Sequence, residues 1–98
     1  MFKYNNNCTF NGILVDNPKS IQVEETTKAT FLLKIQDNNN DYILIPCELW
    51  SNGAEFFVNN FVKDDKVWVQ CTYKTDKWKK DGELRTKNVF RVNTFGKL

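Results

Sequence analysis

The feature that most constrains the fold is a change in the spacing of apolar residues at Trp50. In Tyr42–Trp50 (YILIPCELW) the apolar residues alternate, and one face of the predicted strand carries Ile43, Ile45, Cys47 and Leu49. In Ser51–Val62 (SNGAEFFVNNFV) they recur at helical spacing, as Ala54, Phe57, Val58, Phe61 and Val62. The sequence therefore predicts a strand that runs directly into a short helix. Phe57 and Phe61 are expected in the core, and Ser51 or Asn52 is expected to cap the helix.

Other stretches have the composition of strands, namely Cys8–Val15, Ala29–Asp37, Lys66–Tyr73 and Leu84–Phe95, with a brief pairing expected at Ile21–Val23. Gly12 indicates a bulge or tight bend, and Asp81-Gly82 predicts a hairpin turn. Three strands, one helix and two strands joined by a long hairpin is the order of an OB-fold. We therefore predict an all-β fold, a five-stranded OB-fold barrel with one short helix between strands 3 and 4. A chain of 98 residues is expected to form a single domain, residues 1–98.

Several classes of function are disfavoured by what the sequence lacks. No apolar run approaches the roughly 20 residues of a membrane span, and MFKYNNNCTF lacks the apolar part of a signal peptide, so a cytoplasmic protein is expected. The chain has no histidine, which excludes Ser-His and Cys-His catalytic pairs. Cys8, Cys47 and Cys71 are too widely spaced for a zinc site and are expected as reduced, buried thiols. We expect no enzyme activity, no metal or other cofactor, no small-molecule substrate and no membrane partner.

The charge is distributed unevenly along the chain. Residues 1–62 carry four Lys against seven Asp and Glu, a net charge of −3, whereas residues 63–98 carry ten Lys and Arg against five Asp and Glu, a net charge of +5. A basic half of this kind indicates a polyanionic partner. The alternative is a solvated basic face that binds no ligand.

The predicted hairpin tip, KTDKWKKDG, places Trp78 among basic side chains, which are Lys74, Lys77, Lys79, Lys80, Arg85 and Lys87. Single-stranded nucleic acid needs both elements, because cations pair with phosphates and flat rings stack on unpaired bases. Trp50 lies on the outward face of its predicted strand, together with Tyr42 and Leu44. The alternatives are that Trp78 folds back on its hairpin or joins a subunit contact, and that Trp50 packs over the start of the helix. Trp68 points away from the core face of its strand and is a candidate for an oligomer interface.

Several of these stretches resemble the bacterial single-stranded DNA-binding protein (SSB) family. DYILIPCELWSNGAEF is the closest match, because the family has a similar stretch from its third strand into the helix. Looser matches are NGILVDNP, FLLKIQD, FVKDDKVWVQCTY and KTDKWKKDGELRTKNVFRV. The resemblance covers roughly residues 8–95.

This resemblance implies an OB-fold, assembly into a homo-oligomer (a dimer or tetramer), and binding of single-stranded DNA with little sequence preference. Trp50 and Trp78 stand at stacking positions of the family, and Lys63 and Lys77 stand where basic side chains commonly meet phosphates. Lys79, Lys80 and Arg85 complete the basic hairpin. Leu44 replaces a stacking aromatic, and the chain stops at Leu98 without the family's flexible linker and acidic tip. A tail-less member of the family is therefore expected. The compact chain and its many asparagines suggest a phage, plasmid or other mobile element as its source.

Three functions remain open at this point. The first is binding of single-stranded DNA by aromatic stacking and Lys/Arg–phosphate contacts, in DNA replication, recombination or repair. The second is an accessory OB-fold subunit of a replication or primosome complex, which would bind a replication enzyme with its aromatic face. The third is an RNA-binding OB-fold of cold-shock type, against which the predicted helix argues.

Overall fold

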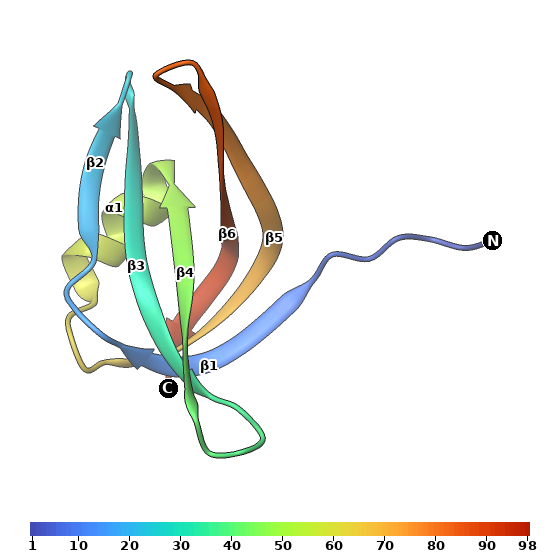
Figure 1. Ribbon diagram of the computed structural model, residues 1–98. Helices are drawn as coiled ribbons and strands as arrows, with labels where there is room; N and C mark the ends of the chain where they lie inside the picture. The colour runs from blue at the N-terminus through green and yellow to red at the C-terminus, as the bar shows by residue number, and fades with distance from the viewer.

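The computed structural model describes residues 1–98 and consists mostly of β-strands (Figure 1). The elements are β1 (Cys8–Leu14), β2 (Lys19–Val23), β3 (Thr26–Gln36), β4 (Tyr42–Trp50), α1 (Ser51–Asn60), β5 (Lys66–Lys80) and β6 (Glu83–Lys97). The predicted strand Tyr42–Trp50 coincides with β4, and α1 follows it with no loop between them. The change in apolar spacing therefore located this junction correctly.

Five of the strands form a closed barrel, as the sequence predicted. The hydrogen-bonded order is β1-β5-β6-β4-β3, and β1 also pairs with β3, which closes the ring. All these pairs are antiparallel except β4 with β6. β2 pairs with β3 outside the ring. A closed five-stranded barrel with one helix between β4 and β5 is an OB-like fold. No helix of the structure is long and apolar enough to cross a membrane.

The last two strands form a hairpin that is longer than predicted. β5 extends to Lys80 and β6 begins at Glu83, so the connection is only Asp81-Gly82. Both residues have positive φ, 54° and 80°, as a two-residue type I′ turn requires. The tip of this hairpin and the tip of the β2–β3 hairpin both lie at the top of the molecule in the view of Figure 1.

The core is built around the aromatic face of α1. Phe57 is fully buried and stacks between Phe31 of β3 and Phe61, at ring-centre distances of 4.4 and 4.3 Å. The edge of Phe95 on β6 also meets Phe57 at 5.2 Å. The prediction that Phe57 and Phe61 belong to the core is therefore confirmed. Through these rings the helix packs against β3 and β6.

Several local predictions are wrong at the ends of elements. Neither Ser51 nor Asn52 caps α1, because Trp50 is the cap residue and Ser51 takes a positive φ of 62° in the sharp turn from strand to helix. Val62 is 56% exposed, because the helix ends at Asn60, before the apolar pattern does. Ile43 is 41% exposed, whereas the other three predicted core residues of β4 are buried.

Gly12 is needed for a close approach between strands and not for a bulge. It pairs with Val67 of β5, and the next residue, Ile13, pairs with both Lys66 of β5 and Lys34 of β3. A Cβ atom at Gly12 would lie 2.4 Å from the carbonyl oxygen of Lys34. The irregularity in the ladder lies elsewhere, between Gln70 and Cys71 of β5.

The three cysteines, far apart in the sequence, come together in the barrel. Cys8 of β1 is the cross-strand partner of Cys71 on β5, and Cys47 of β4 contacts Cys71 through their side chains. All three are free thiols, with Cys47 and Cys71 buried and Cys8 partly exposed. The neighbouring Cys71 thiol, together with burial, raises the pKa of Cys47, so this thiol stays protonated. Cys47 Sγ donates to the carbonyl oxygen of Ile45 at 3.6 Å.

Replacing Gly12 by alanine is expected to lower the free energy of unfolding by about 1–3 kcal/mol, the usual cost of overpacking. The control is Gly53→Ala in α1, where the added Cβ would meet nothing closer than 3.6 Å. That variant is expected to gain about 0.5–1 kcal/mol, because alanine loses less backbone entropy in a helix. Urea unfolding measures both. If Gly12→Ala is as stable as the unsubstituted protein, the close approach at Lys34 does not constrain barrel closure.

Candidate functional site

A groove lies between the β5–β6 hairpin and the outer face of β3 and β4. It has a volume of about 580 Å³. One wall comes from the hairpin, with Trp78 and Lys87, and the other comes from β3 and β4, with Lys28, Leu32 and Pro46. The connection from β1 to β2 contributes Asp16 and Asn17 to the lining. Three segments far apart in the sequence thus form a single hollow. Its lining mixes aromatic and apolar side chains with three lysines and three carboxylates, those of Asp16, Glu48 and Asp76.

Trp78 faces this groove from the hairpin. Its ring is 44% exposed, although it lines the hollow. Its cross-strand partner is Arg85, and the preceding pair on the same face is Asp76 with Lys87, which also line the groove. Trp78 is therefore neither buried in the core nor fully folded against its own hairpin.

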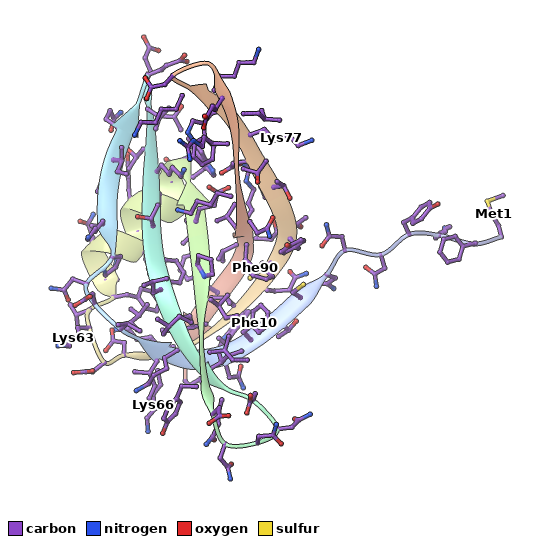
Figure 2. The ribbon with its side chains drawn as sticks, viewed as in Figure 1. Met1, Phe10, Lys63, Lys66, Lys77 and Phe90 are labelled. Carbon is purple, nitrogen blue, oxygen red and sulfur yellow. The ribbon has the colours of Figure 1, made fainter.

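The predicted basic residues of the hairpin divide between its two faces. Side chains alternate along a strand, so Lys80 and Arg85 share the face of Trp78, whereas Lys77 and Lys79 point to the opposite side. Figure 2 shows Lys77 pointing away from β3 and β4. Arg85 also pairs with Glu83 at 3.4 Å on the exposed hairpin. Lys74 and Lys87 also share the face of Trp78, so four of the six cations that the sequence placed in the hairpin lie on that face, and Lys87 lines the groove.

Lys63 lies in the connection between α1 and β5, well away from Lys77 (Figure 2). Its side chain is exposed, and its backbone N–H donates to the side-chain oxygen of Asn17 at 2.8 Å. Because Asn17 lines the groove, this bond holds the backbone of Lys63 near it. Lys63 itself is not among the residues that line the groove.

Trp50 is partly buried, and cations lie over its ring. The Nζ atom of Lys28 is 5.2 Å and the Cζ atom of Arg91 is 5.7 Å from the ring centre, within the range of cation–π attraction. Its indole Nε1 is buried and has no hydrogen-bond partner. Trp50 therefore lies under a layer of cations, unlike Trp78.

Trp68 is also partly buried, on the outer side of the barrel at β5. It faces Gly96 of β6, where a Cβ atom would lie 2.5 Å from the indole nitrogen. The absence of a side chain at Gly96 gives the indole room to lie against the β6 backbone. Trp68 takes no part in the groove.

Glu48 is the residue of the site that sequence reasoning missed. Alternation placed it on the outward face of β4, and it does point there, but its side chain is only 1% exposed. Lys28, Lys74 and Arg91, from three other strands, surround its carboxylate. The only signal in the sequence is a carboxylate in the middle of an otherwise apolar strand. Lys19 and Lys28, which also line the groove, gave no signal of their own.

The sequence matches no protein-family model, and no curated protein matches it. The similarity of its motifs to the SSB family therefore stays a prediction from those motifs.

The three indoles are expected to differ in access to solvent. Trp78→Phe should remove most of the fluorescence that acrylamide quenches in the free protein, since Trp78 is the most exposed of the three. Trp50→Phe and Trp68→Phe are the matched controls and should leave the quenchable fraction nearly unchanged. Stern–Volmer titrations of the three variants test this. Equal loss in all three would contradict the placement of Trp50 and Trp68.

Proposed function

We propose that this protein binds single-stranded DNA, largely without sequence preference, through the groove between the β5–β6 hairpin and the β3–β4 face. The observation that carries the proposal is the exposed ring of Trp78 on the wall of a groove that also presents Lys19, Lys28 and Lys87. A flat ring stacks on an unpaired base, and the cations neutralise the phosphates on either side. A role in DNA replication, recombination or repair follows from this substrate.

A single strand suits the groove better than a duplex does. In duplex DNA the faces of the bases are covered by their neighbours, so an exposed indole has nothing to stack on. The opposite wall of the groove adds apolar side chains, Leu32 and Pro46, which are cross-strand partners on β3 and β4. Farther along this face, Tyr42 is exposed and Lys34 lies 4.8 Å from its ring centre. Apolar and aromatic contacts of this kind accept any base, which supports binding without sequence preference.

Binding to oligo-dT should quench tryptophan fluorescence and weaken steeply with salt. For single strands the slope of log K against log salt is about −0.7 for each phosphate neutralised. Titration of dT oligomers of increasing length, with light scattering on the same samples, measures the affinity, the site size and the oligomeric state. Absence of binding at low salt, or stronger binding to oligo-U and to duplex DNA, would contradict the proposal.

Trp78→Ala should weaken binding of oligo-dT by about 1–3 kcal/mol, the usual contribution of one stacked base. Trp68→Phe is the control, because Trp68 lies outside the groove. Trp50→Ala is expected to weaken binding as well, either through a lost stacking contact or through the cations over its ring. Unchanged affinity of Trp78→Ala would remove the basis of the proposal.

The two faces of the β5–β6 hairpin should contribute unequally to the affinity for oligo-dT. The double variant Lys80→Gln, Arg85→Gln is expected to weaken binding more than Lys77→Gln, Lys79→Gln, which removes the same charge from the face that points away from Trp78. Titrations at one salt concentration compare the pair. A larger effect of Lys77 and Lys79 would mean that the strand follows the outside of the hairpin.

A second candidate function is that of an accessory subunit that binds a replication enzyme. The observation that favours it is the pair of exposed side chains Tyr42 and Leu44 on the outward face at the start of β4. Exposed apolar patches often mark protein contacts, including self-association, for which Trp68 is the other candidate. Co-purification with a replication enzyme together with only weak dT binding would favour this role.

A further inference from the structure

One buried carboxylate that lines the groove, Glu48, holds three cations: Lys28, which also lines the groove, and Lys74 and Arg91, which lie beside Glu48. The Glu48 side chain accepts from Arg91 Nε at 3.2 Å and pairs with Lys28 Nζ at 3.3 Å and Lys74 Nζ at 3.7 Å. The three cations come from β3, β5 and β6, and Glu48 comes from β4. Four strands of the barrel thus meet at this single side chain.

The cluster holds more positive charge than burial of Glu48 requires. A buried carboxylate needs a paired, hydrogen-bonded cation, and one would suffice. Here three cations surround it, and Asp76, which pairs with Lys74 at 3.1 Å, adds a second carboxylate. One positive charge is left over. A phosphodiester carries one negative charge, which matches this excess.

The cations are fixed and still reach solvent. Their side chains are 24% (Lys28), 30% (Lys74) and 43% (Arg91) exposed. Arg91 uses only Nε toward Glu48, which leaves the terminal N–H groups of its guanidinium free to donate. Trp50 lies against Lys28 and Arg91 and restricts them further. Long cationic side chains that are ordered before binding lose less entropy when an anion arrives.

We propose that Lys28, Lys74 and Arg91 form a subsite for one phosphate of the bound strand, and that Glu48 is the positioning residue that holds them. This inference rests on the proposed binding of single-stranded DNA. In it, Glu48 promotes binding of an anion although it carries a negative charge itself. The face of the Trp50 ring contacts Lys28 and Arg91 and helps to hold them in place.

The sign of the effect of Glu48→Gln tests the proposal. By charge alone, removing a carboxylate from the groove would strengthen DNA binding. If Glu48 positions the cations, Glu48→Gln weakens binding to oligo-dT on the order of tenfold, the size of one charge-assisted hydrogen bond. The salt slope should also become shallower by about 0.7, the contribution of one phosphate. Unchanged or tighter binding by a folded Glu48→Gln protein overturns the proposal.

The second set of variants removes the cations and does not depend on the folding of Glu48→Gln. The triple variant Lys28→Gln, Lys74→Gln, Arg91→Gln should lower the salt slope by about 0.7, because all three meet the same phosphate. A drop of about three times that size would mean three separate phosphate contacts and overturns the shared subsite. Lys97→Gln is the matched control, since Lys97 also pairs with a carboxylate, Asp65, and lies 5.1 Å from a ring, Phe61, but outside the groove.

The two proposals fail in different ways. If the unsubstituted protein neither binds oligo-dT nor shows quenching, the proposed function falls. Alternatively, the protein binds oligo-dT and loses affinity in Trp78→Ala. If Glu48→Gln and the triple variant then keep the original affinity and salt slope, only the proposed phosphate subsite is contradicted. Thermal unfolding of every variant confirms that the folded protein is compared in each titration.

Discussion

The groove depends on closure of the sheet by β1. This strand pairs with β5 along most of its length and with β3 at Ile13 and Leu14, so the ring returns to its starting edge. Closure requires the β1 backbone to approach β3 closely, which Gly12 permits. In an open sheet the β5–β6 hairpin and the β3–β4 face would not be opposed. The hollow between them is therefore a consequence of the barrel, and the hairpin length only sets how far it extends.

The buried carboxylate of Glu48 decides where the cations at this groove lie, and this matters more than how many cations there are. Lysine and arginine side chains on a surface are mobile and are largely screened by salt. Glu48 forms ion pairs with three cations, those of Lys28, Lys74 and Arg91, because the barrel brings their strands together around its side chain. The two tryptophans near the site, Trp50 and Trp78, therefore differ in their surroundings. Trp78 is exposed on the hairpin wall, whereas Trp50 lies beneath cations and supports them.

Much of the fold could be predicted because its signals are local. The period change at Trp50, the Asp81-Gly82 turn and the aromatic face of α1 each depend on a few neighbouring residues. The errors fall where neighbours in space decide the outcome. Ser51 does not cap the helix because the chain turns sharply after β4, and Val62 is exposed because α1 ends before the apolar pattern does.

By itself, the sequence determined the types and order of the elements and the presence of an indole in a basic hairpin. Backbone propensity, apolar period and turn chemistry act over a few residues, so they can be read along the chain. Only the tertiary structure decided which hairpin cations turn toward Trp78 and which residues surround Glu48. The ion pairs of Glu48 join residues 20 to 43 positions apart. Such contacts exist only after the strands have taken their register around the barrel, and no local pattern encodes them.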